Sequence, residues 1–366
     1  MKKIISVVGT RPNFIKIAPI IRALKPYRDQ FTHCLCHTGQ HFDEKMSTVF
    51  FDELEMPKPD FYLGINQGSH AVQTAGIMVE FEKVLLREKP DLVIVPGDVN
   101  STMACSLAAA KLSVKIAHVE SGLRSFDRDM PEEVNRIITD VISDYLFVTE
   151  ESGLKNLKNE GVDPGKIFFT GNTMIDSLVY FKEKINRSST LESLGLEEGK
   201  YILVTFHRPS NVDNDAGLTE IIAFLNNLAE HHKVVFPIHP RTRTNLQKLP
   251  ASGALNPNLV LLNPLGYFDF LKLIGHAKLV ITDSGGIQEE TTFLGVPCVT
   301  VRNNTERPST VDVGTNILAG TNLVNVSVIV QNILQGNKKQ GTLPELWDGH
   351  AADRVVAILS KQLATR

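Results

Sequence analysis

Short apolar segments rich in β-branched residues alternate with longer segments of helical periodicity along the whole chain. Each apolar segment is hydrophobic at successive positions rather than at every second one, which is typical of parallel strands covered by helices on both faces. We therefore predict an α/β protein built from two doubly wound parallel sheets. The strands are expected at residues 4–8, 32–36, 92–95, 116–119, 145–148 and 167–170 in the first half and at 202–206, 234–238, 259–262, 279–282 and 298–301 in the second.

The length of the chain and one polar segment indicate two domains. A chain of 366 residues exceeds one ordinary hydrophobic core. Residues 182–200, rich in charge, Ser and Gly, are expected to form a surface linker with a short helix, and residues 347–363 have helical spacing. Ligands of doubly wound sheets bind at the carboxyl ends of the strands, so we expect function in a cleft that those ends share.

Composition and charge exclude several classes of protein. The 38 basic and 41 acidic residues give a net charge of -3, so no overall field favours nucleic acid or an anionic membrane, and any anion site must be local. The first apolar run ends at Gly9 without a cleavage-site pattern, and no apolar stretch reaches the roughly 18 residues of a membrane helix. We expect a cytoplasmic protein whose four cysteines are reduced core thiols.

The segment Asp283-Ser284-Gly285-Gly286 is a candidate phosphate site, because it joins an apolar strand to a helix. Backbone N–H groups and the positive end of the helix dipole would meet an anion there, and glycines let a ligand approach the backbone closely. Simple N-capping by Asp283 or Ser284 is the alternative.

A second candidate follows the first strand, in Gly9-Thr10-Arg11-Pro12. Arg11 and Lys16 bracket the first turn of a helix, where cations oppose the helix dipole and an anionic ligand would explain them. Two solvated surface cations are the alternative.

Acidic residues follow two buried strands. Asp98 comes after residues 92–95 and Glu120 after residues 116–119, so both lie at the carboxyl edge of the sheet. Burial there can raise the pKa of a carboxyl group enough for general acid or base catalysis. Either residue could instead cap the following helix.

A helix is predicted to begin at Pro131. Glu132 and Arg136 are spaced i, i+4 on the face away from its apolar stripe, and we interpret them as an exposed ion pair. The stripe that we expect to face the core consists of Val134, Ile137, Ile138, Val141 and Ile142.

Two histidines end matched strands of the second half, His207 after residues 202–206 and His239 after residues 234–238. A strand-end histidine can donate to phosphate or carry a proton, although a structural histidine is the alternative for each. Arg307 lies just beyond another strand, at residues 298–301. No metal site is expected, since His37 and His41 lack a third nearby ligand.

Together these segments resemble the non-hydrolysing UDP-N-acetylglucosamine (UDP-GlcNAc) 2-epimerase family over nearly the whole chain. The resemblance implies the GT-B architecture, with Rossmann-like domains at residues 1–172 and 173–346, a final helix at 347–366 that packs back on the first, and a homodimer. It implies no cofactor. The matching motifs are Gly9-Thr10-Arg11-Pro12 with Lys16, His37-Thr38-Gly39-Gln40-His41, Gly97-Asp98, His118 to Arg124, Pro131 to Arg136, Gly171-Asn172-Thr173, His207-Arg208, Asp283 to Glu290 and Thr305-Glu306-Arg307-Pro308.

The same resemblance implies roles for individual residues, with UDP bound mainly by the second domain. Glu290 would hold the ribose, and Gly266 and Phe270 would frame the uracil. The residues implied at the diphosphate are Ser284, Gly285 and Gly286, with Arg11, His207 and His239 as further binding residues. Those implied around the sugar are Lys16, Asp98, Glu120, Glu132, Arg136, His207 and Arg307.

The chemistry of such a substrate favours elimination. C2 of the sugar carries the acetamido nitrogen and is not adjacent to a carbonyl group, so its proton is poorly acidic. Anti elimination of UDP from C1, with removal of the C2 proton by a carboxylate, would leave a 2-acetamidoglucal, to which UDP adds back while the opposite face of C2 is protonated. Asp98, Glu120 and Glu132 are the acid and base candidates, and their assignment to the two faces stays open.

Two departures from the family pattern affect regulation. Pro209 and Ser210 stand where many bacterial members have Arg-Glu, and the segment from Gln67 to His70 lacks an arginine found there. Those positions resemble an allosteric site for a second UDP-GlcNAc. We therefore do not expect allosteric activation, and we regard Gln40 and His41 as a remnant of that site.

The resemblance leaves more than one function open. Residues 37–42 and 125–131 also resemble relatives that epimerise UDP-2,3-diacetamido-2,3-dideoxy-glucuronic acid, whereas residues 288–290 and 306–308 favour UDP-GlcNAc. A UDP-sugar glycosyltransferase of the same architecture would bind a similar ligand, and so would a non-catalytic nucleotide-sugar sensor. An epimerase product would feed synthesis of a surface polysaccharide.

Overall fold

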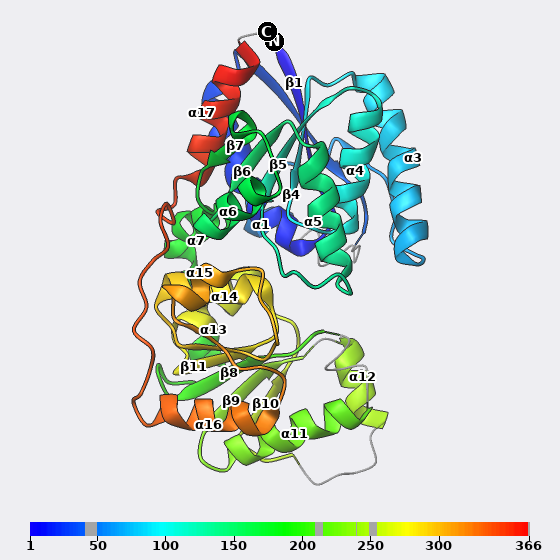
Figure 1. The fold of residues 1–366 in the computed structure, drawn as a ribbon. Helices are drawn as coiled ribbons and strands as arrows, with labels where there is room; N and C mark the ends of the chain where they lie inside the picture. Colours follow the sequence, from blue (N-terminus) through cyan, green and yellow to red (C-terminus); the bar gives the residue numbers. More distant parts are fainter. Residues whose placement is uncertain (41–49, 209–214, 239, 249–254, 365–366) are drawn as a thin grey trace. The chain divides into compact units, whose positions relative to one another are not determined.

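The computed structural model describes residues 1–40, 50–208, 215–238, 240–248 and 255–364. Contacts divide the chain into two units, the first formed by Met1–Tyr180 with Glu345–Arg366 and the second by Phe181–Pro344. Figure 1 labels their helices and strands. Among the described residues, no helix is long and apolar enough to cross a membrane.

The first unit is built on a parallel sheet of seven strands in the order β3-β2-β1-β4-β5-β6-β7. This is the doubly wound order, in which the direction of winding reverses between β1 and β4. All six strands predicted for this half are present, and the two-residue edge strand β3 was not predicted. The strands are β1 (Lys2–Val8), β2 (Phe31–His37), β3 (Phe61–Tyr62), β4 (Leu92–Pro96), β5 (Lys115–Ser121), β6 (Tyr145–Val148) and β7 (Ile167–Phe169).

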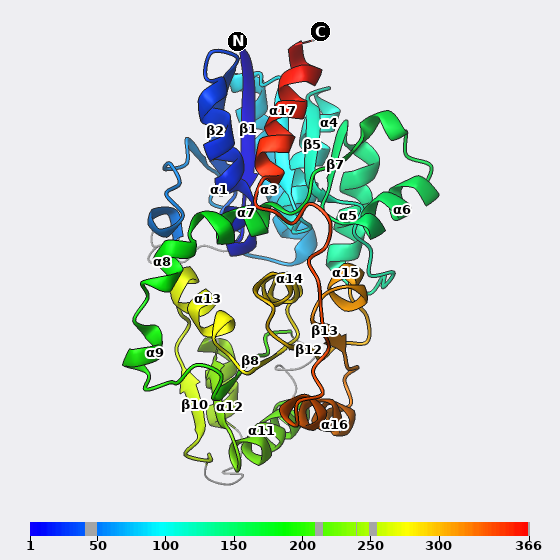
Figure 2. The ribbon, with the colours of Figure 1, turned by 90° about the vertical axis from the view of Figure 1, so that its left-hand side faces the viewer.

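Helices cover both faces of this sheet (Figure 2). Helices α1, α7 and α17 pack together on one face, and α3, α4 and α5 pack in sequence on the other. The helices of the unit are α1 (Arg11–Leu24), α3 (His70–Glu88), α4 (Asn100–Lys111), α5 (Pro131–Ile142), α6 (Glu151–Asn159), α7 (Thr173–Tyr180) and α17 (Ala351–Ala364), with short 3-10 turns at Lys25–Tyr27 and Pro164–Lys166.

Helices α7 and α17 are tied to the first unit by buried hydrogen bonds. Ser177 on α7 donates to the carbonyl oxygen of Ile15 at 2.6 Å. Asp176 accepts from the first two backbone N–H groups of α17, at 3.1 and 2.6 Å, and the indole of Trp347 donates to the carbonyl of Thr149 at 3.0 Å. Contacts therefore divide the chain after Tyr180 and after Pro344, rather than at residues 172 and 346.

The second unit repeats the topology with six parallel strands in the order β10-β9-β8-β11-β12-β13. Its winding reverses between β8 and β11. The five predicted strands are present, and the edge strand β13 was not predicted. The strands are β8 (Tyr201–Thr205), β9 (Lys233–Pro237), β10 (Leu259–Leu262), β11 (Leu279–Thr282), β12 (Cys298–Thr300) and β13 (Asn316–Leu318).

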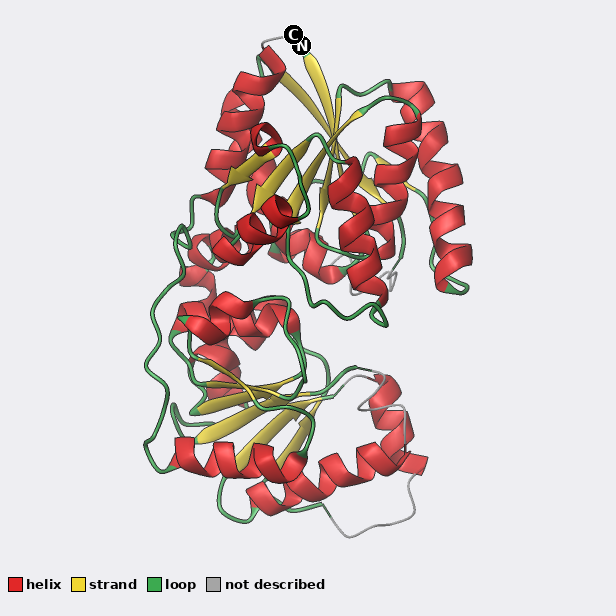
Figure 3. Cartoon of the chain, in the orientation of Figure 1, coloured by secondary structure: helices red, strands yellow, loops and turns green. Residues whose placement is uncertain are grey.

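In this unit α11 and α16 cover one face of the sheet and α13 and α14 the other (Figure 3). The expected linker at 182–200 contains two short helices, which pack on α13. Phe181, the N-cap of the first of them, contacts the ring of Phe268 at 5.1 Å between ring centroids. The helices are α8 (Lys182–Asn186), α9 (Thr190–Ser193), α11 (Asp215–Ala229), α12 (Pro240–Lys248), α13 (Tyr267–Gly275), α14 (Gly285–Leu294), α15 (Pro308–Asp312) and α16 (Leu323–Leu334).

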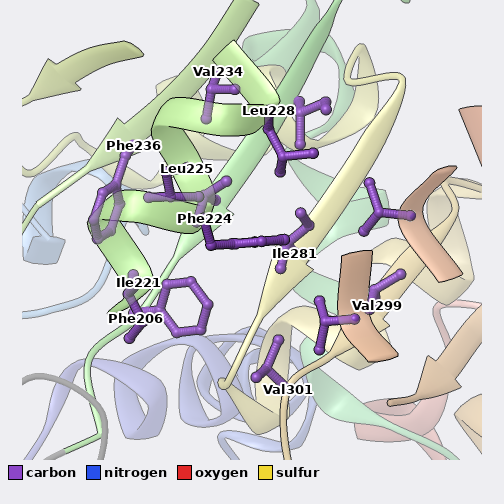
Figure 4. Packing of buried hydrophobic residues seen from close by; sticks show 14 of the residues in the cluster. Phe206, Ile221, Phe224, Leu225, Leu228, Val234, Phe236, Ile281, Val299 and Val301 are labelled. Carbon is purple, nitrogen blue, oxygen red and sulfur yellow. The ribbon is translucent and has the colours of Figure 1, made fainter. Parts of the chain in front are cut away.

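The core of the second unit lies between its sheet and helices α11 and α16 (Figure 4). Phe206 and Phe236, from the ends of neighbouring strands, meet edge to face at 6.3 Å between ring centroids. Leu225 of α11 and Ile281 of β11 belong to the same buried cluster. Burying each such side chain contributes about 1.5–3 kcal/mol, so this layer holds the strand ends in fixed positions.

Helix α5 forms where it was predicted, but the prediction of its buried face was wrong. Val141 is 67% exposed, and Val134, Ile137 and Ile138 are only half-buried. The buried residues of the helix are Glu133, Asn135, Arg136, Thr139 and Asp140. Polar side chains can turn inward here because the loops after β4 and β5 supply charged and hydrogen-bonding partners for them.

Candidate active site

The carboxyl ends of β4 and β5 bring two acidic residues to one edge of the first sheet. Pro96 pairs with Val119 across these strands, so Asp98 and Glu120 follow neighbouring positions. Glu120 interrupts the pairing of β5 with β6 and has a φ of +73°. Positive φ in a residue with a side chain costs about 1–3 kcal/mol and is typical of functional sites, and a bulge redirects the side chain it carries.

Glu120 forms a buried ion pair with Lys16 of α1. The two charged groups lie 2.6 Å apart, and their side chains are only 3% and 5% exposed. Gly97 has a φ of +64°, and a Cβ atom there would lie 3.1 Å from the Lys16 ammonium group. The ammonium group of Lys16 therefore lies against a carboxylate, and a side chain at position 97 would crowd it.

Asp98 is paired with Arg136, which is 2% exposed. The guanidinium group of Arg136 lies 2.8 Å from the carboxylate of Asp98 and also contacts Glu133. The interpretation of Glu132 and Arg136 as an exposed ion pair is therefore wrong for Arg136, because α5 turns this side chain towards the sheet. Glu132 itself is half-buried at the start of α5.

Glu133 was not singled out in the sequence, yet it holds the loop between β5 and α5. Its carboxylate accepts from the backbone N–H groups of Ser125 and Phe126, both at 2.9 Å, and from the Ser125 hydroxyl at 3.0 Å. Phe126 has a φ of +59° and is 78% exposed. The loop is thus fixed by the helix that carries Arg136.

A buried group centred on Asp140 lies behind these residues. Asp140 pairs with His118 Nδ1 at 2.6 Å and accepts from Arg124 at 2.7 Å and from the Gly122 N–H at 3.0 Å. The other ring nitrogen of His118 lies 2.7 Å from the carbonyl of Gly97. Burial alone would raise the pKa of Asp140, but the charges and hydrogen bonds of His118 and Arg124 bring it below its ordinary value. This group links the loops that carry Asp98 and Glu120.

In the second unit, the candidate phosphate segment lies at the start of α14. Ser284 is the N-cap but makes no side-chain capping hydrogen bond, and Ser284, Gly285 and Gly286 are half-buried. A Cβ atom on Gly285 would lie 2.6 Å from the side chains of Arg307 and Glu306. Any other residue at position 285 would therefore push against the side chains of Arg307 and Glu306, which pack behind the helix start.

Arg307 belongs to a buried ionic group behind α14. Its side chain is 6% exposed, lies 3.1 Å from Glu289, and also pairs with Glu306, which in turn pairs with Arg302 at 2.7 Å. Glu290, the next residue on α14, is also buried. The sequence motifs include Glu289 and Glu306, but sequence reasoning did not predict that these residues pair with Arg307 and Arg302, because ionic neighbours across a fold leave no periodic signal.

His207 lies beside the same helix start, where the sheet reverses its winding between β8 and β11. Its Nδ1 atom lies 2.7 Å from Asp283, whose side chain is fully buried. Ligands of doubly wound sheets bind at this reversal point. His239 lies outside the described residues.

The remaining candidates are spread over both units. Gly266 is the N-cap of α13 and accepts from the N–H of Phe270, which is half-buried. Arg11 lies over the ring of Phe50 at 4.2 Å. The side-chain oxygen of Gln40 accepts from the N–H and hydroxyl of Ser101 at 3.0 and 2.6 Å, near the start of α4, and His41 lies outside the described residues.

The paired carboxylates of the first unit are of a kind that can transfer protons. In the second unit, a helix start beside a histidine is of a kind that can bind an anion. Among the described residues, no group of three or more His, Cys, Asp or Glu side chains is arranged to hold a metal ion.

Comparisons with known proteins agree with this geometry. The family model for UDP-N-acetylglucosamine 2-epimerase matches residues 23–360. A UDP-N-acetylglucosamine 2-epimerase of Methanocaldococcus jannaschii is 43% identical over 98% of this chain and 99% of its own length. A UDP-2,3-diacetamido-2,3-dideoxy-D-glucuronate 2-epimerase of Pseudomonas aeruginosa is also 43% identical, over 87% and 88%.

The solved structures give the same result. The M. jannaschii UDP-GlcNAc 2-epimerase in complex with UDP-GlcNAc and UDP has a TM-score of 0.90 at 42% identity, over 99% of this chain and 100% of that one. A Rickettsia africae glycosyltransferase, at 12% identity and a TM-score of 0.55, shares the fold alone. The predicted α/β GT-B architecture, the family and the assignment as an epimerase are confirmed, and the chain belongs to the UDP-N-acetylglucosamine 2-epimerase family.

Proposed function

We propose that this protein interconverts UDP-GlcNAc and UDP-N-acetylmannosamine (UDP-ManNAc) by elimination and re-addition of UDP. The observation that carries the proposal is the edge of the first sheet, where Asp98 and Glu120 each pair with a buried cation. Two carboxylates held at neighbouring strand ends suit removal of the C2 proton from one face and protonation of the other. Glu132, half-buried at the start of α5, is the third acid or base candidate.

In this proposal the second unit binds UDP and the first acts on the sugar. The start of α14 supplies backbone N–H groups and a positive dipole end for the diphosphate, which is the leaving group. The proposed UDP-binding residues are Ser284, Gly285, Gly286, Glu290, Gly266, Phe270, His207, His239 and Arg11. The proposed sugar-binding residues are Lys16, Arg136 and Arg307, with Lys16 and Arg307 acting through the carboxylates that they contact.

The proposed elimination needs no cofactor. Departure of UDP from C1 takes the bonding electrons with it, and a carboxylate takes the C2 proton, which leaves a neutral 2-acetamidoglucal. In re-addition a second carboxylic acid protonates C2 from the other face, and an oxygen of UDP forms the new bond to C1 as the double bond is lost. Microscopic reversibility requires the two carboxyl groups to exchange acid and base roles between the two directions.

Incubation of the pure protein with UDP-GlcNAc alone tests the proposal. Anomeric NMR signals should show UDP-ManNAc appearing without an acceptor, and in deuterated water both sugars should acquire deuterium at C2. Transfer only in the presence of an acceptor would identify a glycosyltransferase, and stoichiometric free sugar with UDP would identify hydrolysis. Binding without any turnover would indicate a nucleotide-sugar sensor.

The substrate itself has a second candidate. The P. aeruginosa relative named for a diacetamido-glucuronate has the same 43% identity as the M. jannaschii relative named for UDP-GlcNAc, over 87% rather than 98% of this chain. A competition assay with both nucleotide sugars decides between them, because the preferred substrate has the higher kcat/KM. We propose UDP-GlcNAc, supported by the name of the matching family model.

We also propose that the protein is a homodimer that forms through α3, α4 and α5. These helices pack in sequence, and α3 exposes Val72, Val79 and Leu86, which recur every seven residues and so share one face. Val141 of α5 is exposed in the same layer. Exposed apolar side chains gathered on adjacent helices are typical of subunit interfaces.

Light scattering after size exclusion tests the dimer. The Val79→Lys/Val141→Lys variant should elute as a folded monomer, whereas Val324→Lys, at an exposed position on α16, should leave the mass unchanged. A monomeric parent protein at micromolar concentration would contradict the proposal.

As a UDP-sugar epimerase with four free thiols, the protein would act in the cytoplasm and supply an amino-sugar precursor for a surface polysaccharide.

A further inference from the structure

Asp283 occupies the end of β11, next to the end of β8, where the second sheet reverses its winding. Thr282 and Thr205 are paired in the register of these two strands, so the residues that follow them are neighbours. Asp283 is fully buried, whereas the His207 side chain is 59% exposed. A buried carboxylate thus lies directly behind an accessible imidazole.

The two oxygens of Asp283 share the backbone N–H of His207, which lies 3.2 Å from Oδ1 and 3.1 Å from Oδ2, and each has a further partner. Oδ1 lies 2.7 Å from His207 Nδ1. Oδ2 accepts from two backbone N–H groups, those of His207 at 3.1 Å and Arg208 at 3.0 Å. Arg208 in addition donates through Nε to the carbonyl oxygen of Asp283 at 3.1 Å. The carboxylate is therefore held from behind by the backbone and has one oxygen aimed at the ring.

This arrangement determines the tautomer of His207. An ionised carboxylate only accepts hydrogen bonds, so the Nδ1 atom beside it must carry a proton. In the neutral ring Nε2 then has the lone pair, and it lies on the side of the ring away from Asp283. Nε2 is the atom that can accept a proton and, once protonated, donate to an anion while the carboxylate balances the charge on the ring.

We propose that Asp283 is a positioning residue that keeps His207 in the Nδ1–H tautomer and presents Nε2 to the diphosphate of the UDP-sugar. The proposal rests on the proposed function, because it assigns the ligand of His207 to UDP. Asp283 also directly precedes Ser284, the N-cap of α14. The buried side chain of Asp283 therefore orients the histidine. Its backbone leads directly into the helix start that is proposed to bind the diphosphate.

The Asp283→Asn variant separates this role from simple anchoring of the loop. Because two N–H groups converge on Oδ2, the amide oxygen of asparagine should take that position and its NH₂ group should face Nδ1. Nδ1 must then accept, so the imidazole proton moves to Nε2. The wrong tautomer at a catalytic histidine lowers kcat by orders of magnitude, and we expect a loss of at least about 100-fold with UDP affinity changed less than about threefold.

Nitrogen NMR of the full chain, with ¹⁵N-labelled histidine at alkaline pH, measures the tautomer directly. The His207 signals are assigned by their absence from the His207→Gln variant. The parent protein should show protonated Nδ1, the Asp283→Asn variant protonated Nε2, and both should bind UDP by calorimetry. Thr205→Val removes the 2.6 Å hydrogen bond to Thr282 at the same strand ends and should leave the tautomer unchanged.

A double-mutant cycle supplies the kinetic test. If Asp283 acts through His207, then Asp283→Asn should not lower kcat further in the His207→Gln background. A further loss in that background, or a His207 that keeps its Nδ1 proton beside asparagine, would overturn the proposal. Absence of epimerisation by the parent protein would instead count against the proposed function, since the tautomer and UDP affinity are measured without turnover.

Discussion

Replacing Lys16 by methionine should destabilise the first unit far more than removal of a surface lysine. The pair with Glu120 is buried, with 2.6 Å between the charged groups. At an effective dielectric constant of about 20, that separation corresponds to a Coulomb attraction of about 6 kcal/mol, which the desolvation of both charges largely offsets. Lys16→Met removes the attraction but leaves the carboxylate buried, so we expect a loss of about 3–5 kcal/mol in the free energy of unfolding.

Urea unfolding followed by tryptophan fluorescence is suited to this measurement. Trp347 is the only tryptophan of the chain and is buried in the first unit, together with Lys16 and Glu120. With a slope of about 2 kcal/mol per molar urea, the midpoint should fall by about 1.5–2.5 M. The Lys16→Met/Glu120→Gln double variant should recover most of this loss, because no charge is then left buried.

The matched control is Lys83→Met on α3. Lys83 pairs with Glu80 at 2.7 Å, but its side chain is 65% exposed, so the free energy of unfolding should change by less than about 0.5 kcal/mol. A Lys16→Met loss below about 1 kcal/mol, or a double variant that loses the sum of the two single losses, would refute the reasoning about a buried charge.

Three further measurements test the site and its surroundings. Glu120→Gln should lose at least about 100-fold in kcat and in deuterium exchange at C2 while UDP affinity stays within about threefold, and retained exchange would exclude Glu120 as an acid or base. Gly285→Ala should weaken UDP binding by about tenfold in calorimetry, since its Cβ atom would lie 2.6 Å from Arg307; Gly275→Ala, with the nearest atom at 3.8 Å, is the control and should bind normally. Burial lowers the pKa of His37 to about 4, so the unfolded state takes up the proton first as the pH falls from about 6.5 to 4. About 3 kcal/mol of stability present above pH 6.5 should be lost across that range, and a His37→Gln variant with the same pH dependence would contradict this assignment.

The strands of both sheets could be predicted because hydrophobicity at successive positions is a local property of the chain. β4 and β11 are almost entirely apolar and are buried at every position, and their bounds agree with the prediction to within one residue. The edge strands β3 and β13 were missed. They are two and three residues long, and β13 begins with a buried asparagine that donates to Gln288 at 3.0 Å. Each is therefore too short to show a run of apolar residues that would predict a strand.

Helix α5 shows where periodicity stops being informative. Its spacing predicted the helix, but the pattern does not say whether an apolar stripe faces the core or another surface. Arg136 and Asp140 turn inward because Asp98 and His118, which are distant in sequence, are there to pair with them. A paired and hydrogen-bonded charge can be buried, so the polar face was the one that packed.

The sequence by itself determined the two doubly wound sheets, the family and the residue types at the strand ends, since these follow from local pattern and motif. Only the tertiary structure decided which of those residues pair. His207 meets Asp283, and Lys16 meets Glu120, because the sheet orders place β8 beside β11 and β1 and β5 on either side of β4. Strand order depends on how the helices pack over the whole sheet, and so the partners of a strand-end charge are set by contacts that no short segment of the chain contains.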